Sequence, residues 1–280
     1  MKITLAAAFS IQGNISQNMD KIEAVLRTHP DQDFVLFGEA FIQGFNSLNF
    51  NPDHDQQFAL DHGDPPLRRL QEMAKTFHSG IGVGYFRFHA GKWTSNDLII
   101  SNSGEILLDY ARMSPGWKIP GANPQFYTEG KQSGIFSYRG KRIGVLLCGD
   151  GWTDEVVSAM VSQQPDLVFW PVFVCFPLDE WKQGQAEAYA AQAASFAKRV
   201  VLINNLDSPG GKGAGAGRRF RYSKRTDSGF AALGSGRLSD TGNTGITIRF
   251  FLYQTGRLNF HFSLYTRLLN FLHKLATIGT

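Results

Sequence analysis

The sequence predicts an α/β fold, in which strands alternate with helices around a sheet. Short apolar runs recur along residues 2–204 and are separated by amphipathic segments. A hydrophobic content of 42% with 19% charged residues is typical of a folded globular domain, and 280 residues suffice to bury a large core. Periodicity alone gives this class and no finer architecture.

Strands are expected where a short apolar run ends in polar or glycine-rich sequence. These runs are residues 2–9, 33–37, 80–86, 97–101, 142–147, 166–170 and 200–204. Helices are expected at residues 16–28, 67–78 and 179–198. The first helix begins at a serine that can cap it, and the last is rich in alanine and is expected to pack on a sheet.

Cys148 lies where the apolar run 142–147 breaks into a polar, glycine-rich turn. A strand end holds a side chain rigidly, and glycines after it let a substrate carbonyl approach the backbone. Free N–H groups of Gly149 and Asp150 in such a turn can stabilise an oxyanion. Cys148 is therefore a candidate nucleophile, and the alternative is a small hydrophobe that ends a strand.

Two further segments supply the other groups that a thiol nucleophile needs. Glu39 ends the apolar run 33–37 and has aromatic neighbours, so we expect it in apolar surroundings as a general base, with a solvated loop glutamate as the alternative. The segment 110–118 carries Arg112 and Lys118, and its proline and glycine predict an ordered loop. A base to take the thiol proton and a cation to stabilise the oxyanion meet the needs of acyl transfer without histidine or metal.

These motifs resemble the nitrilase, or carbon–nitrogen hydrolase, superfamily, whose members use a Glu–Lys–Cys triad in that chain order. The family usually has Pro-Glu where this chain has Gly38-Glu39, and Tyr-Arg-Lys where it has Tyr110-Ala111-Arg112. The resemblance covers about the first three quarters of the chain. It includes the strand at residues 2–8, Asn18, Glu39, the loop 110–118, Cys148 and residues 201–205.

Two residues compete for the role of the family's lysine. Arg112 falls in register with it, whereas Lys118 supplies the residue type six positions later. A lysine carries a compact ammonium, while an arginine can hold a carboxylate or carbonyl oxygen in a forked geometry. We therefore predict that Lys118 is the catalytic cation and that Arg112 orients Glu39 or the substrate.

The resemblance implies a four-layer α-β-β-α sandwich and thiol-dependent hydrolysis of a non-peptide carbon–nitrogen bond. The expected substrate is a small amide or carbamoyl-amine, cleaved through a cysteine thioester by Glu39, Lys118 and Cys148. Trp152, Phe173 and Tyr189 are candidates to line the substrate pocket, with core packing as the alternative for each. A homo-oligomer is also expected.

The composition changes near residue 212. From there to the end, eleven Lys or Arg stand against Asp227 and Asp240. We therefore predict a carbon–nitrogen hydrolase domain at residues 1–211 and an atypical basic segment at 212–280. The segment is a divergent completion of the domain, a basic arm for nucleic acid or acidic lipid, or the product of a reading-frame shift near residue 217.

No cofactor is expected, because the histidines lack metal-ligand spacing and the glycine-rich loop lacks the ending of a phosphate-binding loop. Two cysteines, the absence of a signal-peptide pattern and the lack of about eighteen consecutive apolar residues favour a cytoplasmic protein without a membrane span. A nucleic-acid partner is not favoured. The competing hypothesis is a catalytically impaired family member whose basic tail binds an anionic partner, with affinity that falls steeply as salt rises.

Overall fold

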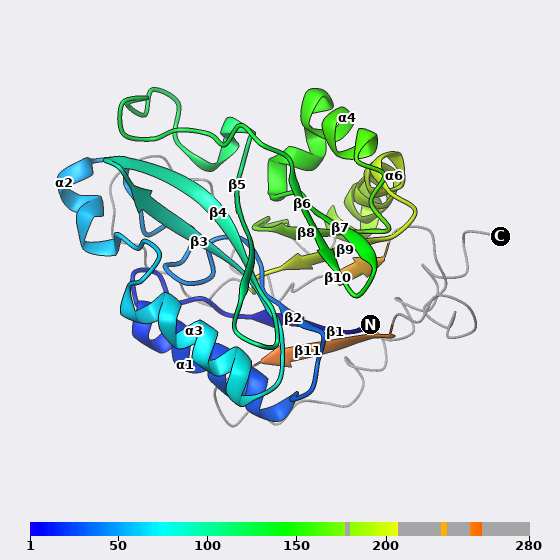
Figure 1. Ribbon diagram of the computed structural model, residues 1–280. Helices are drawn as coiled ribbons and strands as arrows, with labels where there is room; N and C mark the ends of the chain where they lie inside the picture. The colour runs from blue at the N-terminus through cyan, green and yellow to red at the C-terminus, as the bar shows by residue number, and fades with distance from the viewer. Residues whose placement is uncertain (177–179, 207–230, 234–246, 254–280) are drawn as a thin grey trace.

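The computed structural model describes residues 1–176, 180–206, 231–233 and 247–253. These residues form two sheets that pack face to face, with helices on both outer faces (Figure 1). The four-layer α-β-β-α sandwich implied by the resemblance is therefore confirmed. Predictions about the remaining residues of the basic segment lie outside the described residues.

The first sheet has the strand order β11-β1-β2-β3-β4-β5. The pairs β11–β1, β1–β2 and β2–β3 are parallel. The pairs β3–β4 and β4–β5 are antiparallel. The strand β2 is apolar, fully buried and lies between β1 and β3. Glu39 follows its carboxyl end by three residues. The bounds are β1 (Lys2–Ala8), β2 (Phe34–Leu36), β3 (Ile81–His89), β4 (Lys92–Ile100), β5 (Ile106–Ala111) and β11 (Thr247–Tyr253).

The second sheet has the order β10-β9-β8-β7-β6. Its three central strands are parallel, and an antiparallel strand closes each side. The chain therefore leaves β7, β8 and β9 at the same edge, where ligands bind in many α/β proteins. The bounds are β6 (Gly134–Tyr138), β7 (Lys141–Val145), β8 (Leu167–Val172), β9 (Val200–Asn204) and β10 (Ala231–Leu233).

Three hydrophobic cores hold the four layers together. Helices α1 (Ile15–Thr28) and α3 (Pro65–Thr76) pack on the first sheet, and α4 (Asp154–Ser162) and α6 (Ala186–Phe196) pack on the second. Between the sheets, side chains such as Leu5, Ile99 and Phe169 are at most 1% exposed. Burying each side chain of this size stabilises the fold by about 1.5–3 kcal/mol. The described residues also form the short helices α2 (Pro52–Asp55), η1 (Gln56–Phe58), η2 (Pro115–Trp117), η3 (Cys148–Trp152) and η4 (Trp181–Gln185).

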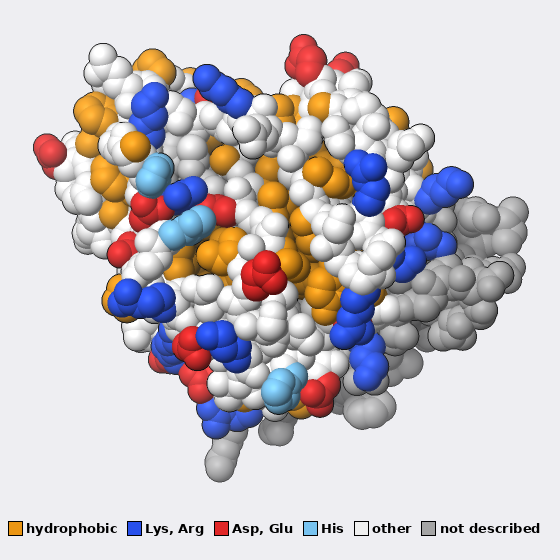
Figure 2. Space-filling view, viewed as in Figure 1, with side chains coloured by type: hydrophobic (Ala, Val, Ile, Leu, Met, Phe, Trp, Pro, Cys, Tyr) orange, Lys and Arg blue, Asp and Glu red, His pale blue; other side chains and the backbone are white. Residues whose placement is uncertain are grey.

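The edge strands β5 and β6 were not predicted from the sequence. Figure 2 shows hydrophobic side chains gathered near the middle of the face where these strands lie. The side chains of Leu107, Leu108, Ile135 and Tyr138 are only partly buried. The apolar residues of each strand are interrupted by a polar one, Asp109 in β5 and Ser137 in β6, which weakens the strand signal. Helix α4 was also missed, and the expected strand 97–101 is the last part of the longer β4.

All seven expected strands and the helices at 16–28 and 67–78 are present. The expected helix 179–198 is shorter, and η4 and α6 meet near Gly184, whose φ of 152° is not helical. Two strands of the 212–280 segment, β10 and β11, extend one sheet each. Within the part of the chain that the structure describes, no helix combines the length and apolar character needed to cross a bilayer.

Candidate active site

Three residues from strand ends of both sheets lie together. Glu39 follows β2, Arg112 follows β5, and Cys148 is the first residue of η3, after β7. Arg112 Nη1 lies 2.7 Å from Glu39 Oε1, and the charges of both residues act on the Cys148 thiol. The structure thus brings Glu39, Arg112 and Cys148 into one cluster.

The Glu39–Arg112 ion pair is buried, with side chains 0% and 3% exposed. Ser95 Oγ donates to the same carboxylate oxygen, Oε1, over 3.3 Å, and Arg112 Nε donates to Ser114 Oγ over 2.8 Å. The other carboxylate oxygen, Glu39 Oε2, is buried and has no hydrogen-bond partner. One oxygen of Glu39 is therefore held by the pair, and the other is available to accept a proton.

Cys148 has a backbone conformation that L-residues rarely adopt, with a φ of 50°. Its carbonyl oxygen accepts a hydrogen bond from Trp170 Nε1 over 2.8 Å, which helps to fix the turn. A left-handed residue at the start of η3 turns the chain sharply at the end of β7. Such strained positions cluster at functional sites, and this one carries the predicted nucleophile.

The Cys148 thiol is in its neutral form at physiological pH. Burial raises the pKa of Cys148 to about 12, and the negative charge of Glu39 adds to this effect. The charge of Arg112 and a hydrogen bond from the backbone N–H of Phe173 act in the opposite direction and favour the thiolate. A thiol with a raised pKa needs a base at the moment of attack, and Glu39 is the carboxylate beside it.

Lys118 lies apart from this cluster. Its Nζ atom is 2.5 Å from Glu129 Oε1 and donates to the carbonyl oxygen of Tyr127 over 3.0 Å. Arg112 is fixed by the backbone hydrogen bond from its N–H to the carbonyl of Ser95, and η2 then leads the chain to the Glu129 side. The geometry therefore favours Arg112 over Lys118 as the cation beside Glu39.

The backbone N–H of Asp150, which we expected to stabilise the oxyanion, is already used in the structure. Its backbone N–H already bonds to the carbonyl oxygen of Leu147 over 3.1 Å. Its buried carboxylate accepts hydrogen bonds from Tyr110 Oη (2.7 Å) and from the backbone N–H groups of Ser114 (2.7 Å), Leu147 (3.0 Å) and Met113 (3.1 Å). Asp150 thereby ties the nucleophile turn to the loop that carries Arg112.

Gly149 allows the arginine to approach the turn. A Cβ atom at this position would lie 2.4 Å from Arg112 Nη2, which is far inside normal contact distance. Any larger residue would displace the guanidinium from the turn. Gly149 therefore remains the turn residue that can place an N–H group and the cation near one developing oxyanion.

Two adjacent asparagines at the end of β9 fix the backbone around the site. The sequence places them at a strand end near the site but does not reveal these hydrogen bonds. Asn205 Nδ2 donates to the Glu39 carbonyl over 2.7 Å, and Asn205 Oδ1 accepts from the N–H of Gly38 over 3.0 Å. Asn204 makes the equivalent pair of bonds to the backbone of Val174, over 3.1 and 2.8 Å. The signal in the sequence is a pair of amide side chains directly after a buried apolar strand.

Of the three pocket candidates, Trp152 ends the nucleophile turn, and Phe173 and Tyr189 lie beside the thiol. The ring of Tyr189 stacks on Trp170 at 5.3 Å, and Trp152, 45% exposed, meets its edge at 5.0 Å. Burial raises the pKa of Tyr189 to about 12, and the charge at Cys148 adds to this effect. Phe173 supplies the backbone N–H that bonds to the Cys148 thiol, and its ring stacks on Phe45 at 4.7 Å.

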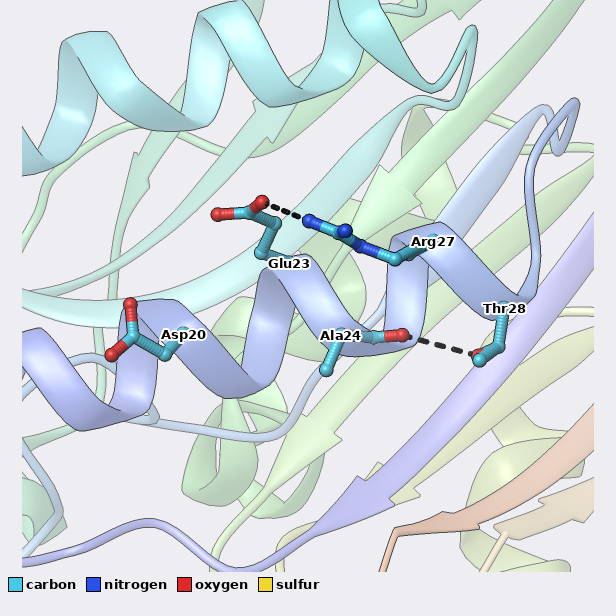
Figure 3. Close-up of a pocket in the computed structure, with 5 residues that line it drawn as sticks. All are labelled: Asp20, Glu23, Ala24, Arg27 and Thr28. Carbon is cyan, nitrogen blue, oxygen red and sulfur yellow. Dashed lines mark hydrogen bonds and ion pairs between the residues drawn. The ribbon is translucent and has the colours of Figure 1, made fainter.

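A hollow lies on the outer surface of α1, away from this site (Figure 3). It is lined by Asp20, Glu23, Ala24, Arg27 and Thr28, and Glu23 pairs with Arg27 over 2.6 Å. All five residues belong to one exposed helix, and none belongs to the cluster around Cys148. Among the described residues, no group of three His, Cys, Asp or Glu side chains is placed to hold a metal ion.

Known proteins with similar sequences include amidases. Curated relatives include N-carbamoylputrescine amidases from Oryza sativa subsp. japonica, 28% identical over 62% of this chain and 59% of the relative, and from Solanum tuberosum, 25% identical over 61% and 59%. The chain thus spans about three fifths of the length of these relatives.

Solved structures show the same fold. A carbon-nitrogen hydrolase from Helicobacter pylori superposes with a TM-score of 0.60 at 16% identity, over 72% of this chain and 73% of that one. An amidase from Nesterenkonia sp. gives a TM-score of 0.55 at 15% identity, over 74% and 76%. The family model described as carbon-nitrogen hydrolase matches residues 3–222. With its fold and this match, the chain belongs to the carbon–nitrogen hydrolase family.

Proposed function

We propose that this protein hydrolyses the carbon–nitrogen bond of a small amide or carbamoyl-amine through a thioester on Cys148. One observation carries the proposal: a buried carboxylate, Glu39, is held by Arg112 through one oxygen and leaves the other without a partner beside the thiol. This arrangement supplies a base, a cation and a nucleophile in one place, with the base and the cation buried.

In the first half of the reaction, Cys148 Sγ attacks the substrate carbonyl carbon while its proton moves to Glu39 Oε2. The carbonyl oxygen becomes an oxyanion, which the Arg112 guanidinium and the N–H of Gly149 stabilise. The carbon–nitrogen bond then breaks as Glu39 returns the proton to the departing nitrogen. Ammonia or an amine leaves, and the acyl or carbamoyl group stays on sulfur as a thioester.

In the second half, a water molecule attacks the thioester carbonyl and gives a proton to Glu39. The carbon–sulfur bond breaks, and the sulfur regains the proton from Glu39. The product is a carboxylic acid, or a carbamic acid that decomposes to carbon dioxide and ammonia. The curated relatives named N-carbamoylputrescine amidase support carbamoyl-amines as a substrate class.

Arg112 takes the role that we first predicted for Lys118. An arginine stays charged throughout the reaction and cannot act as a proton donor. Burial by itself would lower the pKa of Arg112, but the charges of Glu39, Cys148 and Asp150 outweigh it and raise that pKa above its usual value. In this site Glu39 must therefore carry every proton transfer, and Arg112 contributes only charge and position.

The test is release of ammonia from a panel of simple amides and carbamoyl-amines by the full chain. Cys148→Ala and Glu39→Gln should each abolish release, and the exposed Cys175→Ser should not. Mass spectrometry of a substrate with a slow second step should show the acyl group on Cys148. Ammonia release that survives in Cys148→Ala would reject the proposal.

A further inference from the structure

Asp97 is a buried acid that the proposed reaction does not use. Its side chain is on β4 and is 2% exposed, and its Oδ1 atom has no hydrogen-bond partner. None of the ion pairs found among the described residues includes it. An unpaired carboxyl group inside a protein is costly when charged, so its place in the fold calls for an explanation.

The strand register puts Asp97 beside Glu39. Asp97 lies opposite Gly84 of β3, and the two positions point to the same face of the sheet. A Cβ atom on Gly84 would lie 2.6 Å from Glu39 Cα, so the turn that carries Glu39 covers this face. Ser95, two residues before Asp97 and on the same face, donates to Glu39 Oε1 over 3.3 Å.

The surroundings of Asp97 oppose a negative charge. Burial raises its pKa well above the usual aspartate range, and the charges of Asp109 on β5 and Glu39 add to this. Tyr110, its register partner on β5, donates its own hydroxyl to Asp150. Arg112, the buried cation of the cluster, is engaged by Glu39 and Ser114.

We propose that Asp97 is held as a neutral carboxylic acid that positions the Glu39 carboxylate, and that loss of its proton inactivates the site at alkaline pH. The inference rests on the proposed role of Glu39 as the base. While Asp97 is neutral, Glu39 and Arg112 balance each other beside the thiol. Ionised Asp97 would add an uncompensated negative charge that repels both the Glu39 carboxylate and the oxyanion of the reaction.

The first test is infrared spectroscopy of the wild-type protein, which requires no folded variant. At neutral pH we expect a carbonyl band from a protonated carboxyl group, and Asp97→Asn should remove it. Asp109→Asn is the matched control, because Asp109 is paired with Arg87 at 3.0 Å and should lose a carboxylate band instead. Loss of a carboxylate band in Asp97→Asn would overturn the proposal.

The second test is the pH dependence of kcat/KM. In Asp97→Ala, kcat/KM at pH 7 should fall about tenfold or more, and Asp97→Asn should retain most of the wild-type value. In Asp97→Asn, the fall of kcat/KM on the alkaline side should move to higher pH. A merely structural role would leave the alkaline limb in place. An unmoved limb, or an Asn variant as impaired as Ala, would overturn the proposal. Because the infrared band is independent of turnover, failure of the proposed hydrolysis would be seen separately, in the Cys148→Ala control.

Discussion

The loop 110–118 contributes a cation to each of two ion pairs, and these pairs differ in their surroundings. Arg112 meets Glu39 with side chains 3% and 0% exposed, whereas Lys118 meets Glu129 with side chains 15% and 28% exposed. Removing one partner of a buried pair leaves an uncompensated charge, but a partly exposed pair is screened by water. The comparison teaches that burial and partner separate the two cations, and in the proposed mechanism these features, more than residue type, decide which cation serves the reaction.

The largest effect is expected from Arg112→Met, which removes the buried cation. We expect kcat/KM to fall at least about 100-fold, because both the held base and the oxyanion lose their positive charge. We also expect a loss of about 3–5 kcal/mol in the free energy of unfolding, because Glu39 is left buried and unpaired. Steady-state kinetics and urea unfolding measure the two losses. Near-normal turnover in Arg112→Met would break the comparison and return the catalytic role to Lys118.

Asn205→Ala sharpens the comparison by loosening the base while leaving the cation in place. The variant loses both hydrogen bonds that fix the backbone at Gly38 and Glu39. A small misplacement of a reacting group can cost up to about 100-fold, so we expect kcat to fall about 10- to 100-fold with little change in KM. The control is Gln71→Ala, which also removes an amide bonded to a backbone carbonyl, that of Gly104, away from the cluster. Equal losses in the two variants would mean that Asn205 acts through general stability alone.

Glu39→Gln tests the charge of the buried pair through the thiol. Burial and the Glu39 charge raise the pKa of Cys148 to about 12, so wild-type alkylation by iodoacetamide should keep rising with pH and reach no plateau below pH 10. Removing the carboxylate charge leaves Arg112 to favour the thiolate, and the pKa should fall by about one unit or more. Mass spectrometry of a Cys175→Ser background isolates Cys148. An unchanged pH profile would show that Glu39 does not act on the thiol.

The same raised pKa has a defined sign for stability. Between pH 9, the ordinary value for a thiol, and about pH 12, the unfolded chain releases the Cys148 proton while the folded chain retains it. This contribution to stability is complete below pH 9 and is lost as the pH rises toward 12. Cys148→Ala should therefore show a shallower loss of stability on the alkaline side, as measured by urea unfolding at a series of pH values.

The smallest effect is expected from Lys118→Met. The variant removes the pair with Glu129 and keeps most of the packing of the lysine stem against Trp117, over whose ring the ammonium lies at 5.9 Å. We expect less than about a threefold change in kcat/KM and at most about 1 kcal/mol in stability. Steady-state kinetics of Lys118→Met and Arg112→Met under the same conditions compare the two cations directly. A large loss in Lys118→Met would show that distance from Glu39 in the folded chain does not exclude a catalytic role.

The sequence was informative where elements are fully buried and local. The apolar runs that become β2 and β7 place Glu39 and Cys148 at strand ends, and both residues follow from that pattern. The path of the loop after β5 could not be predicted from the sequence. The η2 turn directs Lys118 to Glu129, and the spacing of the residues does not indicate that turn. Asp97 was read as a strand residue, since burial without a partner depends on the cross-strand register of β4.

The left-handed backbone conformation of Cys148 lowers the stability of the fold at the position of the proposed nucleophile. At a φ of 50° the backbone would accept glycine more readily than any residue with a Cβ atom, and cysteine there costs about 1–3 kcal/mol. A glycine at this position should relieve that strain while it abolishes the nucleophile. Selection for stability alone would therefore favour glycine over cysteine at this position. The presence of the thiol indicates selection for a property other than stability.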